Sequence, residues 1–189
     1  MIRETIVTTL SPEGVPHVAP MGATPIDGGW LLQPFRPSRT LENFLATRCG
    51  VVNFTDDARV FAGCVTKRRP EWPTVPAEAL PSVRLMAALA CDEVEVTAVD
   101  DEHGQRPKLT CRTVRQVALR PFPGLNRAIA AVLEGAVLVS RLHMLPAEKI
   151  DAEIAYLQIA IDKTAGEAER EAWGWLLDAV SAHRAKAAS

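Results

Sequence analysis

The spacing of apolar residues changes once along the chain, near Gly124, and this change constrains the fold more than any other feature. Before it, short segments rich in Val, Ile and Thr are separated by turn sequences, as in antiparallel sheets. After it, apolar residues recur every three or four positions, which is helical spacing. The helical stripes are Leu125, Ile129, Val132, Leu133 and Val137; Ile150, Ile154, Leu157 and Ile161; and Trp173, Leu176, Leu177 and Val180. A β half followed by about three helices predicts an α+β fold.

The β half is expected to form a small antiparallel barrel, because its strands are short and joined by tight turns. A helix is expected over residues 40–47, and residues 66–81, with four prolines and no apolar period, are expected to form a loop or lid. Pro16 and Pro20 cannot donate to a sheet, so their strand should have an edge or a bulge. The expected strands are residues 4–10, 16–24, 30–35, 51–55, 92–99 and 109–119.

The length bounds the number of domains. A chain of 189 residues fits one domain, or one domain with a helical appendix. We expect a barrel domain over residues 1–122 and a helical extension, packed on the barrel, over residues 123–189.

The segment from Gln33 to Asn43 carries the clearest candidate binding site. It places Arg36, Ser38, Arg39 and Thr40 where a strand ends and a short helix begins. A helix N-terminus has unpaired N–H groups and partial positive charge, and arginines and hydroxyls add donors suited to a phosphate dianion. The alternative is that Ser38 or Thr40 only caps the helix and both arginines are solvated.

Composition argues against several classes of partner and chemistry. The net charge of −2 provides no basic field for nucleic acid or an anionic membrane, and no apolar run is long enough to span one. The four cysteines are scattered, without metal-ligand spacing, so we expect buried free thiols, no metal and no disulfide. The N-terminus lacks the pattern of a secretory signal, and a cytoplasmic location is expected. Rossmann and nucleophile-elbow motifs do not occur.

Three sequence segments together resemble the FMN-binding split-barrel proteins, the superfamily of flavin reductases and pyridoxamine-phosphate-oxidase-like proteins. They are Thr9-Leu10 followed by Gly14-x-Pro16-His17-Val18-Ala19-Pro20-Met21-Gly22, then Arg36-x-Ser38-Arg39-Thr40-x-x-Asn43, then Val51-Val52-Asn53-Phe54-Thr55. The helical half is similar to that of an uncharacterised family in which a C-terminal helical extension follows the barrel. The resemblance implies an antiparallel split β-barrel followed by a helical bundle.

The resemblance also implies a cofactor, an assembly and a set of binding residues. It implies a homodimer that binds FMN in a groove at the subunit interface, with Arg36, Ser38, Arg39 and Thr40 holding the phosphate. Backbone groups of the second strand would contact the isoalloxazine ring, and Asn43 occupies a position where related flavin reductases also carry Asn. The ring-contacting residues would be Pro20, Met21, Gly22, Ala23 and Thr24.

The sequence does not identify a catalytic residue. His17 lies on the second strand in phase with Ala19, Met21 and Ala23, so it could face the cofactor and act as an acid there. A lone His on a strand is more often a packed or surface residue. Gly22 allows close approach of a flat ring, but it also suits a barrel bulge.

Three functions follow from these observations. The first is an FMN-dependent oxidoreductase that passes hydride or electrons to a small-molecule acceptor, with one-carbon or pterin chemistry suggested by family association. The second is a flavin-binding carrier or sensor without turnover, because fold likeness alone does not establish an activity. The third is a protein that binds another phosphate-bearing coenzyme or nucleotide at the same site.

Overall fold

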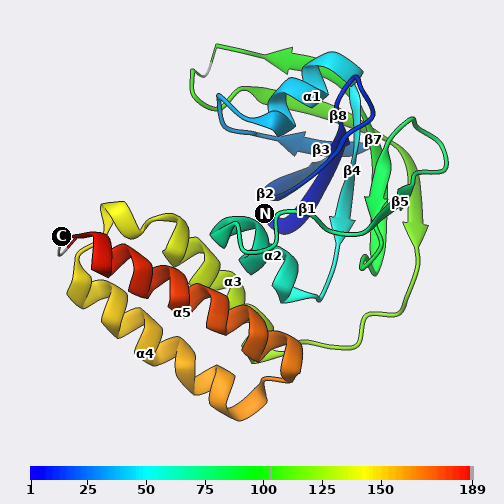
Figure 1. The fold of residues 1–189 in the computed structure, drawn as a ribbon. Coiled ribbons are helices and arrows are strands. Elements are labelled where there is room, and N and C mark those ends of the chain that lie inside the picture. The colour runs from blue at the N-terminus through cyan, green and yellow to red at the C-terminus, as the bar shows by residue number, and fades with distance from the viewer. Residues whose placement is uncertain (103, 188–189) are drawn as a thin grey trace. The chain divides into compact units, whose positions relative to one another are not determined.

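The protein is described from a computed structural model that covers residues 1–102 and 104–187 (Figure 1). The chain divides into two compact units. The barrel unit contains residues 1–55 and 71–122, and the helical unit contains residues 56–70 and 123–189. The helical unit therefore includes a segment, residues 56–70, that the sequence placed in the barrel half.

The barrel unit is a closed antiparallel barrel with the strand order β1-β2-β3-β8-β7-β4 (Figure 1). It and the C-terminal helices confirm the predicted fold class, an α+β split barrel followed by a helical bundle. Helix α1, Arg39–Thr47, connects β3 to β4, as expected for residues 40–47. The strands are β1 Arg3–Leu10, β2 Pro16–Ile26, β3 Gly29–Leu32, β4 Cys49–Phe54, β7 Ala90–Asp100 and β8 Lys108–Ala118.

The inner face of the barrel holds an apolar core. Val7 of β1 is paired with Val52 of β4, and Ala23 of β2 with Leu32 of β3, so alternate residues of neighbouring strands point inward together. Phe44 joins this cluster from α1, because the apolar residues of the helix share the face turned to the barrel. The barrel thereby fixes both the strand edge and the helix start that matter for binding.

The proline-rich segment is part of the sheet structure in the barrel unit. Residues Thr74–Pro76 (β5) pair with Val83–Leu85 (β6) as a short hairpin. The buried carboxylate of Glu93 accepts hydrogen bonds from the backbone N–H groups of Glu78, Ala79 and Leu80 at 2.8, 2.8 and 2.9 Å. Residues 78–80 of the expected loop or lid are thus hydrogen-bonded to β7. The hairpin was not expected from the sequence, because strands of three residues are too short to show an alternating pattern.

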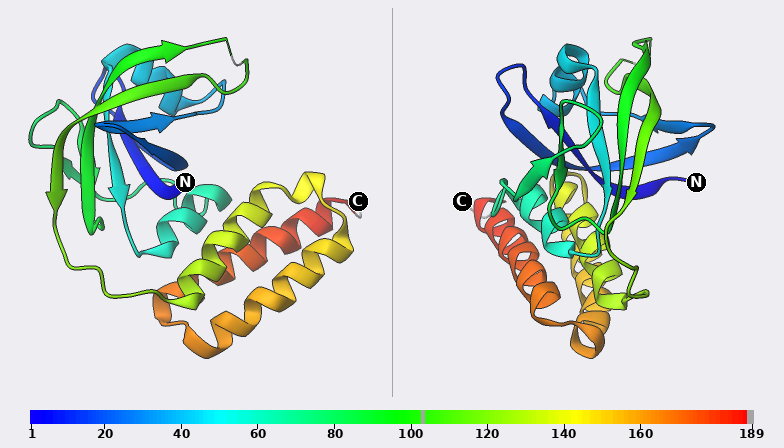
Figure 2. Two further views of the ribbon diagram at one scale, coloured as in Figure 1. Left: turned by 180° about the vertical axis from the view of Figure 1, so that it is seen from behind. Right: turned by 90° about the vertical axis from the view of Figure 1, so that its right-hand side faces the viewer.

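The helical unit consists of four α-helices and a short 3-10 helix in the part of the chain that is described. Figures 1 and 2 show α3, α4 and α5 running alongside one another, with α2 against α3 and α5. Helix α2 was not expected, although Asp57 caps its N-terminus by accepting from Arg59 N. The helices are α2 Ala58–Thr66, α3 Arg127–Ser140, α4 Ala147–Thr164 and α5 Glu167–Ala187, with the 3-10 helix at Leu142–Met144. None of the described helices has the length and apolar character needed to cross a membrane.

Candidate functional site

The N-terminus of α1 presents two backbone donors that the helix does not use. Ser38 is its N-cap: the Ser38 hydroxyl accepts from Leu41 N at 3.2 Å, and the Ser38 carbonyl accepts from Glu42 N at 3.0 Å. The amides of Arg39 and Thr40 precede these and have no acceptor within the helix. Arg39 is exposed, while Thr40 is buried. The capping role of Ser38 and an anion-binding role for this helix end are therefore compatible.

His17 and Asn43 lie at the same end of the barrel as this helix start. His17 of β2 is paired with Thr9 of β1, and the buried Asn43 amide donates to the Thr9 hydroxyl at 2.9 Å. Burial, and then the positive charge of Arg39, lower the pKa of His17. The imidazole is therefore near Arg39 and uncharged at neutral pH.

Strand β2 offers an unpaired backbone edge next to this cluster. Its residues Pro16–Ala23 pair with β1, whereas β3 pairs only with Ala23–Ile26. Within the described sheet, residues 16–22 therefore have a strand on one side only, as the two prolines indicated. Backbone groups at such an edge are available to hydrogen-bond a ligand.

The side chains of the expected ring-binding segment contribute little polar chemistry. Ala23 is fully buried in the barrel core, and Met21 packs against the same core, so they offer mainly backbone groups. The Met21 carbonyl already accepts from the Thr5 hydroxyl at 2.7 Å. A Cβ on Gly22 would lie 2.8 Å from Cγ2 of Ile2, so the space over Gly22 is occupied by an exposed N-terminal side chain. A flat ring placed on that side of Gly22 would meet the Ile2 side chain.

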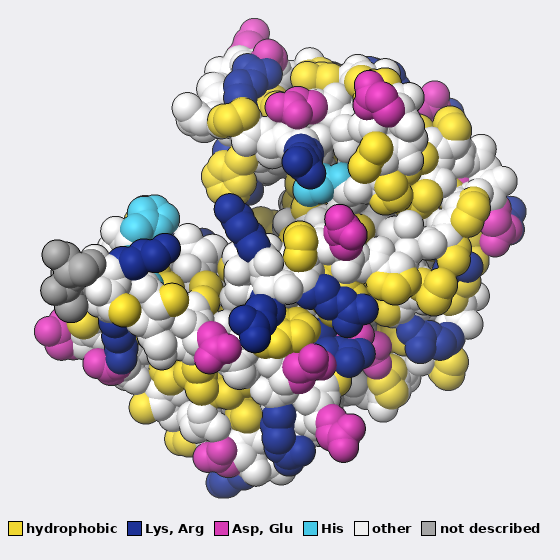
Figure 3. All heavy atoms as spheres, in the orientation of Figure 1, with side chains coloured by type: hydrophobic (Ala, Val, Ile, Leu, Met, Phe, Trp, Pro, Cys, Tyr) yellow, Lys and Arg dark blue, Asp and Glu magenta, His cyan; other side chains and the backbone are white. Residues whose placement is uncertain are grey.

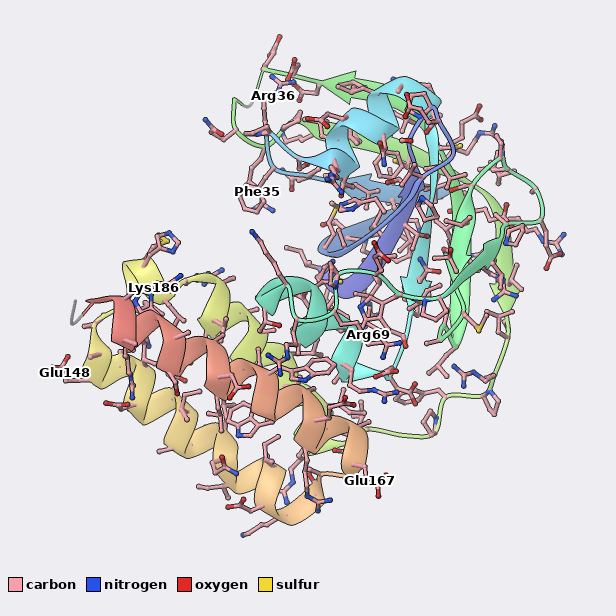
Figure 4. The ribbon with its side chains drawn as sticks, viewed as in Figure 1. Phe35, Arg36, Arg69, Glu148, Glu167 and Lys186 are labelled. Atoms are coloured by element: carbon pink, nitrogen blue, oxygen red, sulfur yellow. The ribbon has the colours of Figure 1, made fainter. Side chains whose placement is uncertain are left out.

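Arg36 has a different partner in this structure. Its guanidinium forms an ion pair with Asp101 at 2.8 Å, and its backbone N–H donates to the Gln105 carbonyl at 2.9 Å. The neighbouring Phe35 ring lies 4.3 Å below the guanidinium of Arg106. Figure 4 shows Phe35 and Arg36 on the loop that follows β3. The structure thus brings together Ser38, Arg39, Thr40, Asn43 and His17, and joins Arg36 to the β7–β8 turn instead.

This arrangement fits the phosphate group of the expected FMN. An anion at the start of α1 would meet two free amides, the helix dipole and the charged fork of Arg39. The ion pair of Arg36 with Asp101 is exposed, so Arg36 can exchange that partner at small cost. On the face shown in Figure 3, basic side chains lie among acidic ones in both units, so the positive charge at this site is local.

The described cysteines and acidic residues form no metal-binding cluster, and Cys91 and Cys111 are poor nucleophiles. No group of three potential metal-ligating side chains occurs there. The four cysteines are free thiols, and burial raises the pKa of Cys91 to about 11 and that of Cys111 to about 12. Such thiols remain protonated and unreactive at neutral pH.

Two residues of the site region were not singled out as site residues from the sequence. Thr9 positions Asn43, and Asp101 holds Arg36. Thr9 stood only within the motif of the resemblance, and Asp101 lay in an acidic turn without any distinguishing signal. Both contacts join residues more than thirty positions apart, so only the fold reveals them.

Comparison with known proteins gives a family match over nearly the whole chain. The model of the DUF447 N-terminal domain, described as a protein of unknown function, matches residues 3–120. A second DUF447 model matches residues 126–178. No curated protein matches the chain.

Solved structures share the fold. An FMN-bound protein from Methanosarcina mazei, also assigned to DUF447, superposes with a TM-score of 0.77 at 24% identity, covering 94% of each chain. The 2-nitrobenzoate 2-nitroreductase of Pseudomonas fluorescens has a TM-score of 0.54 at 18% identity, covering 61% of this chain and 64% of that one. Nitrilotriacetate monooxygenase component B from Mycobacterium thermoresistibile has a TM-score of 0.53 at 21% identity, covering 64% and 71%. The last two cover about the length of the barrel, whereas the first extends through the helices.

Proposed function

The chain belongs to the DUF447 family, and we propose that it is an FMN-binding oxidoreductase that passes hydride or electrons from reduced FMN to a small-molecule acceptor. The observation that carries the proposal is the start of α1, where Arg39 and two free amides adjoin the unpaired edge of β2. The FMN-bound relative with the same fold over 94% of this chain supports the same cofactor. Pterins and other one-carbon carriers are the first acceptors to assay.

Different residues of the site would bind the phosphate and the ring of FMN. Arg39 and the amides of Arg39 and Thr40 would hold the phosphate, and Ser38 keeps the helix start in shape. Arg36 would join them after leaving Asp101. The backbone of residues 20–24 would hydrogen-bond the ring, and Asn43 is held by Thr9 close to the phosphate end. FMN itself supplies the redox chemistry when bound.

The proposal includes a homodimer and a cytoplasmic location. A groove shared by two copies would cover the edge of β2 that one copy leaves unpaired between residues 16 and 22. Four free cysteines fit a reducing compartment.

A second candidate, a flavin-binding carrier or sensor without turnover, is favoured by the state of His17. Its lowered pKa makes it a neutral hydrogen-bonding group near pH 7, which is poorly suited to act as a charged acid. Anaerobic mixing of the FMN-loaded protein with NADH or NADPH separates the two candidates. Rapid bleaching of the flavin and reoxidation by an acceptor support the enzyme, and an inert bound flavin supports the carrier.

The cofactor site is tested by titrating FMN into wild type and Arg39→Ala and following flavin absorbance and fluorescence. We expect the substitution to weaken binding roughly tenfold or more, about 1.4 kcal/mol, because a charge-assisted phosphate contact is lost. Arg112→Ala is the matched control, since Arg112 is an exposed arginine of the same unit that pairs with Glu95. Equal loss of affinity in both variants, or no binding by wild type, would contradict the proposal.

A further inference from the structure

A cavity of about 520 Å³ opens beside the β2–β3 turn and is unrelated to the start of α1. Ile26 lines it, whereas His17 marks the opposite end of the same strand. Nine residues separate them, which is roughly 30 Å along a strand that rises about 3.3 Å per residue. The cavity is therefore a separate place on the barrel, and nothing in the proposed flavin site uses it.

The distinguishing group in this cavity is the carboxylate of Asp92, whose residue is only 6% exposed. Its Oδ2 accepts from the indole Nε1 of Trp30 at 2.8 Å and from the Gln116 amide at 3.2 Å. Both bonds thus reach the same oxygen. None of the described residues donates a hydrogen bond to Oδ1, and Asp92 lines the cavity.

The charge of Asp92 is not neutralised by an ion pair in the described residues. Arg115, which also lines the cavity, pairs instead with Glu78. A buried carboxylate without a cation carries a desolvation cost that a cationic or strongly donating ligand would offset. The cavity is therefore suited to a positive ligand rather than to an anion.

The surroundings of Asp92 select an organic ligand over a metal ion. Trp30 forms one wall, and Ile26 and Val114 are apolar side chains at the rim, each more than one-third exposed. A divalent cation would need several oxygen ligands, and the described residues hold no such cluster. A flat ligand can pack against an aromatic and aliphatic wall while its N–H groups donate to a carboxylate.

We propose that this cavity binds a small planar organic cation of the amidinium or guanidinium class. Its N–H groups donate to Oδ1 of Asp92, and its flat body packs against Trp30, Ile26 and Val114. The site does not depend on flavin, so it stands or fails independently of the proposed cofactor.

The test uses the full chain with benzamidine as the probe and benzoate as a probe of the same shape and opposite charge. Indole resonances of ¹⁵N-tryptophan-labelled protein are followed during each titration, with Trp30 assigned through Trp30→Phe. We expect a saturable shift of the Trp30 indole with benzamidine and none with benzoate. Asp92→Asn, which can still accept from Trp30, should weaken benzamidine binding roughly tenfold or more, because a charge-assisted bond becomes a neutral one.

Two further variants keep the test decisive. Asp27→Asn removes the same charge from an exposed residue of the adjacent turn, so the affinity should change by less than about twofold. Val114→Trp should fill the cavity and abolish the shift, which serves as the test if thermal melting shows that Asp92→Asn does not fold. Equal binding of benzamidine and benzoate, or an unchanged affinity in a folded Asp92→Asn or Val114→Trp protein, would overturn the proposal. Titrating FMN-saturated and flavin-free protein should give the same benzamidine affinity.

Discussion

The two units are stabilised by different kinds of interior. The barrel unit buries nine polar side chains, whereas in the described part of the helical unit the buried side chains are apolar. The core of the helical unit is rich in alanine and is closed by Trp173 and Leu176. The buried polar residues of the barrel unit are Thr5, Thr8, Thr9, Thr40, Asn43, Asn53, Ser82, Asp92 and Glu93.

The difference shows where structural specificity is concentrated. Asn53 donates to the Ile6 carbonyl at 2.9 Å and to Thr8 Oγ1 at 3.0 Å, and accepts from Leu85 N at 2.8 Å, so one side chain ties three segments of the barrel unit together. Such networks are costly to break, because buried polar groups then lose their partners. The helical unit depends on close contact of small residues instead, as at Gly135, where a Cβ would lie 2.8 Å from the Trp173 ring.

The largest expected effect is in the helical unit, at Trp173. Trp173→Ala removes an almost fully buried ring and its 2.7 Å hydrogen bond to Gln158, so the free energy of unfolding should fall by about 3–5 kcal/mol. Urea denaturation followed by circular dichroism measures the change. Tyr156→Ala, at a side chain 73% exposed, is the control and should change stability little. A loss below about 1 kcal/mol at Trp173 would show that the helical core tolerates cavities better than close packing allows.

The second prediction concerns the polar interior of the barrel unit. Glu93→Gln replaces a carboxylate oxygen that faces backbone N–H groups with an amide that donates, so we expect about 2–3 kcal/mol of lost stability. Hydrogen exchange of the amides of residues 78–80 should accelerate as well. Glu95→Gln changes a partly exposed residue of the same strand, which pairs with Arg112, and is the control. Equal stability of the two variants would remove the contrast between the two interiors.

The third prediction tests whether Asp101 competes with the phosphate for Arg36. Asp101→Asn should tighten FMN binding by at most about fivefold, because an exposed ion pair contributes about 0.2–1 kcal/mol. The gain should disappear in an Arg36→Ala background. If Asp101→Asn instead weakened FMN binding by a similar factor, Asp101 would orient Arg36 for binding.

The smallest expected effect is the pH dependence contributed by His17. Burial and Arg39 hold its pKa below the ordinary 6.5, so the unfolded chain binds this proton more readily than the folded protein. The stability that depends on an uncharged His17 should therefore be fully present above about pH 6.5. It should be lost as the pH decreases from there toward the pKa of His17 in the folded protein. Denaturation of wild type and His17→Gln between these limits should show a weaker dependence of stability on pH in the variant.

NMR titration should also show a higher His17 pKa with FMN bound, since the negative phosphate offsets the charge of Arg39. An unchanged pKa would mean that His17 does not lie near the phosphate.

Much of the fold followed from local pattern. Alternation and turns predicted the six barrel strands, helical stripes predicted α3, α4 and α5, and the helical spacing of Leu41, Phe44 and Leu45 predicted α1 over residues 40–47. Helix α2 was missed because it is short and mostly apolar, with Arg59 and Thr66 as its only polar side chains apart from Cys64. The β5–β6 hairpin was missed because its strands have three residues each and lie among prolines, so the sequence shows no alternation. Backbone pairing and the hydrogen bonds to Glu93 stabilise this segment instead.

The sequence by itself determined the α+β class, the family and the donors gathered around residues 36–40, because these depend on local spacing and on short motifs. The tertiary structure decided which of those donors meet. It placed His17, Arg39 and Asn43 together through the pairing of β1 with β2. It also paired the Arg36 guanidinium with the Asp101 carboxylate. It also placed segment 56–70 with the helices and left Asp92 buried beside Trp30. Contacts between residues far apart in the chain depend on strand register and packing, which no local pattern encodes.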